Sequence, residues 1–328
     1  MKTLRLVSSS PQPLLVEQEM PRPDAQPGEI VVRVRAVGVT PTELLWYTTS
    51  HTRNGGPRKA AVLGHEFSGE VAECSDGVRD VAIGQEVYGM NDWFAEGALA
   101  EYCVTRPEWI ANKPQGLSHE EAASVPISAL TAWQGLFERG RLQLGERVLV
   151  HGGTGAVGMF AVQLAHIHGA RVIATVSASN IAFVKSLGAD DALDYRGTPF
   201  EDCVEDIDLV FDTVGAETAR RSWQVLKPAG RLVTIAADSE STPDQSIRKA
   251  FFIVEPNRTQ LEEVGKLLEA GKLQTAVDTV LPVSAATEAY AGTVARQGRG
   301  KLVISTRQWS VPKPSFSKPV SPELCGGA

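Results

Sequence analysis

The hydrophobic positions of this chain follow two different periods, and the change between them divides the sequence into two regions. Before about residue 125, short segments alternate apolar and polar side chains. In Glu29–Val37, for example, Val32 and Val34 lie on either side of Arg33, which is typical of a strand with one buried face. Further strands are expected at Gly64–Val71, Glu86–Met90 and Ala98–Thr105. The first region is therefore predicted to be mostly β.

The second region begins near residue 145 and alternates strands with helices. A helical stretch, Ser118–Gly140, precedes it, with Ser118 and Glu121 spaced as a capping box. Strands are expected at Val148–Val150, Val172–Val176, Ala192–Asp194, Leu209–Asp212 and Leu232–Ile235, and helices at Ala182–Leu187 and Thr218–Leu226. Strands and helices that alternate at these lengths predict a doubly wound parallel sheet. Near residue 250 the chain is expected to return to the first domain, followed by a helix at Arg258–Glu269.

A glycine-rich turn follows the first strand of the second region. Residues 147–158 read RVLVHGGTGAVG, with Gly153, Gly155 and Gly158 in the spacing G-x-G-x-x-G between a strand and a helix. In this context the spacing is typical of a dinucleotide site, because glycine lets the backbone turn tightly and approach a pyrophosphate. The amides at the helix start then face an anion, which the helix dipole also favours. For the spacing alone, a turn that only packs against the sheet is the alternative.

The end of the next strand carries no acidic side chain. An NAD site usually places Asp or Glu there, about 20 residues after the glycines, to accept a hydrogen bond from the ribose 2′-hydroxyl. Here the strand is followed by Ser-Ala-Ser-Asn at residues 177–180, and the first carboxylate is Asp190. Hydroxyl and amide groups without negative charge suit a 2′-phosphate, and Arg196 adds a cation after the following strand. The pattern favours NADP, and it is also compatible with an ordinary helix cap.

Composition and charge limit the class of protein. Of 328 residues, 43% are hydrophobic and 22% are charged, with a formal net charge of −7. These values are ordinary for a globular chain of two domains and argue against a nucleic-acid partner. No apolar stretch approaches the length of a membrane span, and the N-terminal residues do not form a signal peptide. The four cysteines are scattered, so we expect a cytoplasmic protein without a disulfide framework.

Eight short motifs occur in one order along the chain. They are GVTPTE (38–43), GHEFSG (64–69), PISALTAW (126–133), HGGTGAVG (151–158), FVKSLGA (183–189), FDTVG (211–215), GRLV (230–233) and GKLV (300–303). As an ordered set they resemble the medium-chain dehydrogenase/reductase superfamily, and specifically its zinc-independent quinone-oxidoreductase-like branch. The resemblance covers about residues 1–307. It implies an α/β protein in which a GroES-like catalytic domain joins a Rossmann domain, with the active site in the cleft between them.

The resemblance also implies which residues bind the cofactor. The glycine turn would hold the pyrophosphate, Thr131 and Lys301 would lie near the nicotinamide, and the backbone at 251–252 would cover its ring. The full predicted set is Thr131, Gly153, Thr154, Gly155, Ala156, Val157, Gly158, Ser177, Ser179, Asn180, Tyr195, Val214, Phe251, Phe252 and Lys301. Relatives often have Lys or Arg where Ser179 stands, which would weaken the preference for NADP.

A catalytic zinc ion is not expected. Zinc alcohol dehydrogenases of the superfamily have a Cys where this chain has Thr40, and their third ligand falls near Ile127. The remaining His65 and Glu66 do not supply the three protein ligands of a catalytic zinc site, so we predict no metal and a structural or cleft-lining His65. Without a strong Lewis acid, activated acceptors such as quinones and enones suit the site best.

Such acceptors need donors for a developing oxyanion and a pocket for a flat molecule. Thr40, Tyr47 and Asn91 are predicted to be the donors. Three loop aromatics, Trp46, Trp93 and Phe94, are predicted to line the substrate pocket, with core packing or subunit contact as an equal alternative for each.

The combined prediction is an NADPH-dependent, zinc-independent reductase of quinones or α,β-unsaturated carbonyls, acting as a homodimer on a small-molecule substrate. Two alternatives stay open: a zinc-type alcohol or aldehyde dehydrogenase that uses His65 and Glu66, and a cofactor-binding scaffold without turnover. The predicted GroES-like domain comprises residues 1–125 and 255–307, the Rossmann domain residues 126–254, and a flexible tail residues 308–328.

Overall fold

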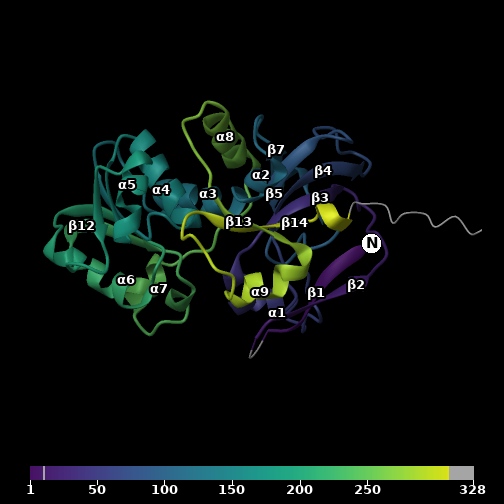
Figure 1. The fold of residues 1–328 in the computed structure, drawn as a ribbon, viewed down its shortest axis with the longest axis horizontal. Coiled ribbons are helices and arrows are strands. Elements are labelled where there is room, and N and C mark those ends of the chain that lie inside the picture. Colours follow the sequence, from purple (N-terminus) through teal and green to yellow (C-terminus); the bar gives the residue numbers. More distant parts are fainter. Residues whose placement is uncertain (10–11, 310–328) are drawn as a thin grey trace, which may run out of the picture.

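The chain forms two units that lie side by side, as Figure 1 shows. The computed structural model describes residues 1–9 and 12–309. The N-terminal strands and the last two strands of the chain make up one unit, and the teal and green segments in the middle of the sequence make up the other. The architecture confirms the predicted α/β fold with a GroES-like and a Rossmann-like unit.

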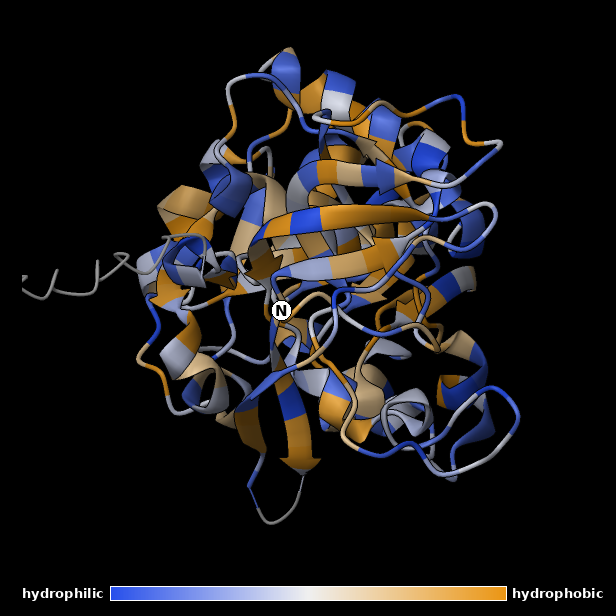
Figure 2. Cartoon of the chain, turned by 90° about the vertical axis from the view of Figure 1, so that its right-hand side faces the viewer, coloured by the Kyte–Doolittle hydropathy of each residue, from blue (hydrophilic) through white to orange (hydrophobic). Residues whose placement is uncertain are grey.

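The GroES-like unit is built on a mostly antiparallel core sheet, in which β13 and β14 alone pair in parallel among the described strands. A separate hairpin pairs β1 (Lys2–Ser8) with β2 (Leu14–Glu19). The seven-stranded sheet has the order β13-β14-β3-β4-β5-β7, and β6 pairs with β3. Its strands are β3 (Ile30–Gly38), β4 (Glu66–Cys74), β5 (Glu86–Met90), β6 (Tyr102–Thr105), β7 (Ile110–Asn112), β13 (Val277–Pro282) and β14 (Lys301–Ser305). Figure 2 shows hydrophobic and hydrophilic segments alternating along the ribbons.

Strand β14 is the strand that matters most for the site, because it brings a late segment of the chain beside β3, which lies early in the sequence. It pairs antiparallel with β3, with Val303 opposite Gly38. The backbone N–H of Val39 also donates to the carbonyl of Leu302, at 2.9 Å. This register places Lys301, the first residue of β14, beside the loop that follows β3.

The Rossmann-like unit is a five-stranded parallel sheet of order β10-β9-β8-β11-β12. Its strands are β8 (Arg147–His151), β9 (Arg171–Val176), β10 (Asp191–Asp194), β11 (Ile207–Asp212) and β12 (Leu226–Thr234). The helices between and after them are α4 (Ala156–Ile167), α5 (Ile181–Ser186), α6 (Ala216–Ser222) and α7 (Gln245–Ala250). The strand order reverses between β8 and β11, so the loops after these two strands border the crevice where ligands bind in such sheets.

Helices at the junction connect the two units. The predicted helical stretch at 118–140 is three helices: α2 (His119–Ala123), α3 (Pro126–Trp133) and a π-helix η3 (Gln134–Arg139). The predicted capping box is present, with Ser118 and Glu121 bonded reciprocally. Helix α8 (Arg258–Glu269), at the predicted bounds, packs against α3 and β7. The shorter helices are η1 (Pro41–Leu45), α1 (Tyr47–Ser50), η2 (Pro107–Trp109), η4 (Ala178–Asn180), η5 (Phe200–Asp202), η6 (Ala237–Ser239), η7 (Val283–Ala285), α9 (Ala286–Ala291) and η8 (Arg307–Trp309).

Several sequence-based boundaries were wrong, among them the start of β12, which lies at Leu226 rather than at Leu232. The helix expected at Thr218–Leu226 ends at Ser222, because Leu226 already pairs with Ile207 in the parallel sheet. Of the strand expected at Ala98–Thr105, only β6 forms, since the backbone at 98–99 bonds to residues 63 and 64 instead. The boundary predicted for the flexible tail, residue 308, lies too early in the chain, because Trp309 is buried and its indole donates to Glu17. The remaining tail residues, 310–328, lie outside the described residues.

Over the described ranges, 1–9 and 12–309, no helix combines the length and the apolar character that crossing a membrane requires.

Candidate functional site

Two cavities meet at the glycine turn between the units. The outer cavity, about 750 Å³, is bordered by the ends of β8, β9 and β11. It is lined by predicted cofactor residues Thr154, Gly155, Ser177, Ser179, Asn180, Tyr195 and Val214. The inner cavity, about 220 Å³, is lined by the predicted residues Thr40, Trp46, Thr131, Gly155, Ala156, Val157, Phe251, Phe252 and Lys301. Because Gly155 borders both, an extended ligand can pass from one cavity to the other along the turn.

Glycine stands at the three motif positions for different structural reasons. A Cβ at Gly158 would lie 2.1 Å from the carbonyl oxygen of Gly152, and one at Gly153 would lie 2.9 Å from the Cβ of Ala174. These two glycines therefore permit close packing within the turn and against β9. At Gly155 the nearest atom to an added Cβ is 3.4 Å away, an ordinary contact distance, so packing within the protein does not require a glycine at this position.

The first turn of α4 borders the inner cavity without a protein cap. Gly155 is the N-cap of α4 and offers no side chain to the amides that follow it. Helix N-termini with free amides and a favourable dipole bind phosphate groups. A dinucleotide pyrophosphate fits this cradle, since the amides supply donors and Gly155 supplies room.

The outer cavity is cationic and polar at the end of β9. The Asn180 amide donates to Ser177 Oγ at 3.1 Å, and the Ser177 and Ser179 hydroxyls are 3.3 Å apart. Arg196 lines the same cavity. Among the described residues that line it, none is acidic. This environment suits a phosphate monoester better than a bare hydroxyl pair.

Arg299 is a site residue that the sequence analysis missed. Its Nε donates to Asn180 Oδ1 at 2.8 Å, and its guanidinium lies over the Phe183 ring, 4.5 Å from the centroid. The contact joins residues 119 positions apart. No local motif reveals it, although two arginines just before the GKLV motif were a weak signal.

His151, the last residue of β8, is a buried neutral side chain in the outer-cavity wall. Its ring nitrogens pair with Thr175 Oγ1 at 3.0 Å and Ser222 Oγ at 3.1 Å. Burial lowers the pKa of His151 to about 3, and the nearby Arg221 adds to this effect. His151 therefore bridges β9 and α6 and carries no charge at neutral pH.

The turn after β11 is shaped by a buried carboxylate. Asp212 accepts hydrogen bonds from the backbone amides of Val214 (3.0 Å) and Gly215 (3.1 Å) and from the Thr234 hydroxyl (2.8 Å). Burial raises the pKa of Asp212. These contacts hold Val214, a predicted cofactor residue, at the rim of the outer cavity.

The inner cavity has a buried ion pair in its wall. Lys301 Nζ contacts Glu66 Oε1, donates to Thr40 Oγ1 at 3.1 Å and lies 3.5 Å from Ser128 Oγ. The other Glu66 oxygen accepts the backbone N–H of Ile127, at 3.0 Å. Strands β4 and β14, the loop after β3 and helix α3 thus meet at one charged cluster beside the cavity.

Burial also affects the lysine's protonation. Lys301 is buried, and this burial lowers its pKa to about 7, while the charge of Glu43 acts in the opposite direction. The direct contact with the Glu66 carboxylate likewise favours the ammonium form. Lys301 therefore has a proton that is held by neighbouring charges and released more readily than that of an exposed lysine.

His65 is engaged in a second buried pair. Its Nδ1 bonds to Glu43 Oε2 at 2.8 Å, and the same oxygen accepts the N–H of Gly64 at 3.0 Å. Its Nε2 lies 3.3 Å from the carbonyl of Ala95. With Glu66 bonded to Lys301, neither member of the His65–Glu66 pair offers a free ligand atom toward the inner cavity.

The predicted aromatic and donor residues are only partly brought together. Trp46 lines the inner cavity and packs edge-on against Trp93, 4.1 Å between centroids. Trp93 is buried and donates to the carbonyl of Val254 at 2.8 Å. Phe94 lines a different cavity, of about 530 Å³, within the GroES-like unit. It lies under the Arg53 guanidinium.

Two predicted donors lie away from Thr40. Asn91 is fully buried, and its amide donates to the carbonyls of Glu96 (2.9 Å) and Val104 (3.1 Å). Tyr47 is 56% exposed, opens the short helix α1 and stacks on His51. Of the three predicted donors, Thr40 alone lines the inner cavity. The motifs could not show this, because it depends on which way each loop turns after its strand.

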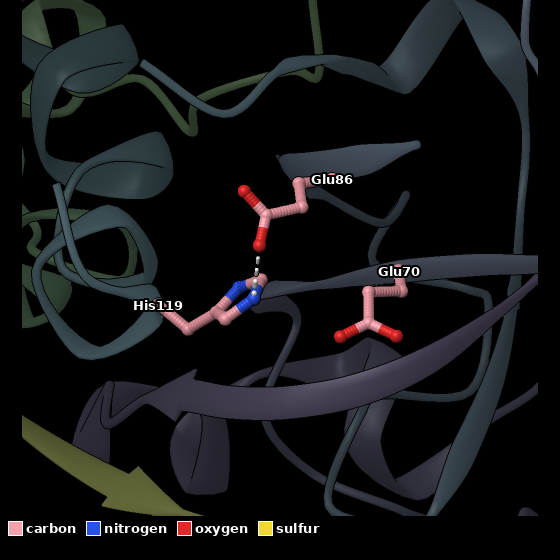
Figure 3. Close-up of side chains that lie close together, drawn as sticks. All are labelled: Glu70, Glu86 and His119. Atoms are coloured by element: carbon pink, nitrogen blue, oxygen red, sulfur yellow. Dashed lines mark ion pairs between the residues drawn. The ribbon is translucent and has the colours of Figure 1, made fainter. Parts of the chain in front are cut away.

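One cluster outside the cleft has the residue types of a cation site. The ligand atoms of Glu70, Glu86 and His119 lie within 4.8 Å of one another, and Figure 3 shows the ion pair between Glu86 and His119 with Glu70 beside it. Glu86 is paired with His119 (3.2 Å) and Lys113 (3.3 Å), and Glu70 is paired with Arg35 (2.9 Å). Because both carboxylates already form ion pairs with these partners, we interpret the cluster as an ion-pair network on the sheet.

The fold and the site together define a two-domain oxidoreductase, with a GroES-like unit and a Rossmann-like unit that meet at a nucleotide cradle. Two family models match the chain: "Alcohol dehydrogenase GroES-like domain" over residues 26–115 and "Zinc-binding dehydrogenase" over residues 187–304.

Known proteins match over most of their length. A zebrafish (Danio rerio) protein named NAD(P)H oxidoreductase RTN4IP1, mitochondrial, is 30% identical, over 85% of this chain and 84% of its own. The 2-methylene-furan-3-one reductase of Solanum lycopersicum is 31% identical, over 89% and 75%. The structure of the quinone oxidoreductase from Coxiella burnetii aligns with a TM-score of 0.82 and 30% identity, over 94% and 99%. The chain belongs to the medium-chain dehydrogenase/reductase superfamily, in its quinone-oxidoreductase-like branch.

Proposed function

We propose that this protein is an NADPH-dependent reductase that transfers hydride to quinones or α,β-unsaturated carbonyl compounds without a catalytic metal. The observation that carries the proposal is the pairing of the two cavities. The outer one is free of acidic residues among those described and is lined by Arg196, which follows β10. The inner one is small, largely apolar and bordered by the hydroxyl of Thr40. The names of the tomato and Coxiella relatives, a reductase of an enone and a quinone oxidoreductase, support the same substrate classes.

The cofactor would be held by the residues that line the cavities. The amides of α4 would bind the pyrophosphate, Ser177, Ser179 and Asn180 the 2′-phosphate, and the backbone at Phe251 and Phe252 would lie along the nicotinamide. When bound, the reduced nicotinamide supplies the hydride. The protein's share is to place a flat acceptor in the inner cavity, exclude water and donate to the acceptor oxygen.

Thr40 is the donor that we retain for this step, because its hydroxyl lines the inner cavity. Trp46, supported by Trp93, would form one wall of the acceptor site. The zinc-dependent alternative would require His65 and Glu66 to leave their partners Glu43 and Lys301. We therefore propose no metal at this site.

The test measures oxidation of NADPH, with NADH in parallel, by absorbance after chelator treatment. A quinone, an enone and a simple aldehyde serve as acceptors, and the metal content of the purified protein is determined. We expect turnover with the quinone or the enone and a lower KM for NADPH. Activity only with the aldehyde and only after zinc is added would support the dehydrogenase. Cofactor binding without oxidation by any acceptor would support the scaffold.

We also keep the predicted division into a GroES-like and a Rossmann domain at residues 125 and 255, the homodimer and the cytoplasmic location as proposals. Helix α8, assigned to the GroES-like domain, contacts both β7 of that domain and α3 of the other. Sedimentation analysis tests the dimer. Fractionation of cells tests the location, which matters because the name of the zebrafish relative includes the word mitochondrial.

A further inference from the structure

We propose that Lys301 is the proton donor for reduction of α,β-unsaturated carbonyls, acting through the hydroxyl of Thr40, and that Glu66 positions it. This inference rests on the proposed function and narrows its substrate class. It concerns the buried cluster beside the inner cavity, in which Lys301 would otherwise serve only as a neighbour of the cofactor.

The geometry provides a continuous route for a proton. Lys301 Nζ donates to Thr40 Oγ1 at 3.1 Å, and both residues line the inner cavity. Thr40 Oγ1 lies 3.3 Å from Glu66 Oε1, to which it donates when no acceptor is present. Rotation of this hydroxyl hydrogen toward a substrate oxygen leaves the lysine as the donor behind it.

The cluster is more than a connection between strands. Glu66 satisfies its second oxygen with the backbone N–H of Ile127, which fixes the carboxylate and directs the lysine to Thr40 and Ser128. The charged groups around the lysine are Glu66 on β4, Glu43 on η1 and Arg296 on the loop before β14. His65 faces Glu43. The two carboxylates keep the ammonium charged, and burial makes its proton easier to lose.

The chemistry needs one hydride and one proton. Hydride forms a C–H bond at the β-carbon of the enone, the C=C pair moves to the α-carbon–carbonyl bond, and the carbonyl π pair becomes an oxyanion. The Thr40 O–H bond breaks as its proton joins that oxygen, and an N–H bond of Lys301 breaks to restore the threonine hydroxyl. The enol becomes the ketone, the neutral lysine takes a proton from solvent, and the sum is enone plus NADPH plus H⁺ giving ketone plus NADP⁺.

Quinones make a useful contrast within the same site. Reduction of a quinone forms an aromatic ring, which stabilises the resulting hydroquinone anion, so this reaction depends less on a proton donor in the same step than enolate formation does. Loss of an internal donor should therefore slow enone reduction much more than quinone reduction. If Lys301 had only a structural role, its replacement would slow both reactions by the same factor.

The experiment compares wild type with Lys301→Met, Lys301→Arg and Thr40→Val, using an enone and a quinone. General acid catalysis commonly contributes at least about 100-fold, so Lys301→Met and Thr40→Val should lower kcat for the enone by about that factor and for the quinone by less than tenfold. Lys301→Arg keeps the charge but holds its proton too strongly, so it should not restore enone turnover. Enone activity of the wild type should fall as pH rises through the Lys301 pKa, and this limb should vanish in Lys301→Met.

A second readout does not depend on turnover. In the cofactor-free protein with ¹³C-labelled lysines, the Lys301 Cε resonance is the one that Lys301→Met removes, and it should titrate well below an ordinary lysine. Lys266→Met, at an exposed lysine paired with Glu263, is the matched control for both measurements. Because Lys301→Met leaves Glu66 buried and unpaired, the double variant Glu66→Gln/Lys301→Met and a melting curve check that any loss does not come from unfolding.

The outcomes separate the two proposals. A wild type that oxidises NADPH with neither acceptor overturns the proposed function, and this inference with it. A wild type active on enones, with folded Lys301 variants that lose enone and quinone activity equally or keep the pH limb, overturns the inference alone. Titration of Lys301 in the range of an exposed lysine would also overturn it.

Discussion

Arg196 and Arg299 lie near the polar side chains that follow β9, and replacing either arginine tests how the cofactor is bound. Arg196 lines the outer cavity, and Arg299 holds Asn180 by a 2.8 Å hydrogen bond. If they favour a 2′-phosphate, Arg196→Ala and Arg299→Ala should each raise the KM for NADPH about tenfold. The KM for NADH should change by less than threefold. Steady-state kinetics with both cofactors checks this, and equal effects on the two would contradict the assignment.

His151 makes a prediction about pH and stability. The folded protein keeps this buried histidine neutral down to about pH 3, whereas its ordinary pKa is 6.5. Between these values the unfolded chain binds more protons, so stability present above pH 6.5 is lost as pH falls. From pH 7 to pH 5, His151 should account for a loss of about 2 kcal/mol in the free energy of unfolding.

Urea denaturation at the two pH values tests this with His151→Asn. The loss on going to pH 5 should be smaller in the variant than in wild type by that amount. His166→Asn, at an exposed position near the end of α4, should lose as much stability as wild type. If the His151→Asn variant also loses as much stability as wild type between pH 7 and pH 5, the folded protein does not hold His151 neutral.

At the scale of a single element, the strand–turn–helix from β8 to α4 separates stability from binding. A Cβ at Gly158 would collide with the Gly152 carbonyl, whereas one at Gly155 would meet no atom closer than 3.4 Å. Gly158→Ala should therefore destabilise the protein by about 2 kcal/mol. Gly155→Ala should change stability by less than about 1 kcal/mol but weaken NADPH binding about tenfold or more.

Chemical denaturation and calorimetric titration of NADPH distinguish the two effects. Each glycine variant serves as the control for the other, because both add one methyl group to the same turn. Unchanged NADPH affinity in a folded Gly155→Ala variant would argue against pyrophosphate binding at this helix start.

The same element shows what the sequence could predict. The glycine turn, α4 and β9 are local, so spacing and periodicity found them, and α8 was found to the residue because Asn257 caps it and its apolar side is continuous. Where a boundary depends on pairing with a distant strand, as at Leu226, local pattern misplaced it. The break between α2 and α3 within 118–140 follows from Pro126, which begins α3.

The candidate site divides in the same way. The residues along the turn and at the end of β9 follow one another in sequence, and the motifs indicated them. The Lys301–Thr40 contact spans 261 positions and the Thr40–Glu66 contact 26, so their meeting depends on β14 joining β3. The family resemblance predicts Lys301 near the cofactor, but the sequence contained no local signal for its pairing with Glu66.

Over the whole molecule, the loop before β14 ties the two units together across the glycine turn. The N–H of Gly300 donates to the carbonyl of Thr154 at 3.0 Å, and the Thr154 hydroxyl donates to the carbonyl of Gly298 at 3.2 Å. A buried carboxylate, Asp278 on β13, holds this loop by accepting the amides of residues 297, 298 and 299 at 3.1, 2.8 and 3.2 Å. The GroES-like unit, through Asp278, therefore fixes the position of this loop, and the loop contacts the glycine turn of the Rossmann-like unit.

Asp278 should consequently affect cofactor binding although it lines neither cavity. Asp278→Asn replaces one acceptor oxygen by an amide that faces N–H donors, and leaving buried donors unpaired should cost about 1–3 kcal/mol of stability. A loop released from the turn should also weaken NADPH binding about tenfold, while kcat at saturating cofactor stays within a factor of about two, because Arg296 is the inner-cavity residue with which Asp278 forms an ion pair, and Thr40 and Lys301 keep their own partners. Asp24→Asn, at an exposed position, controls for the change in net charge. Calorimetric titration and kinetics test the prediction: a folded Asp278→Asn variant with wild-type NADPH affinity would mean that the loop only packs against the glycine turn and takes no part in closing the cofactor site.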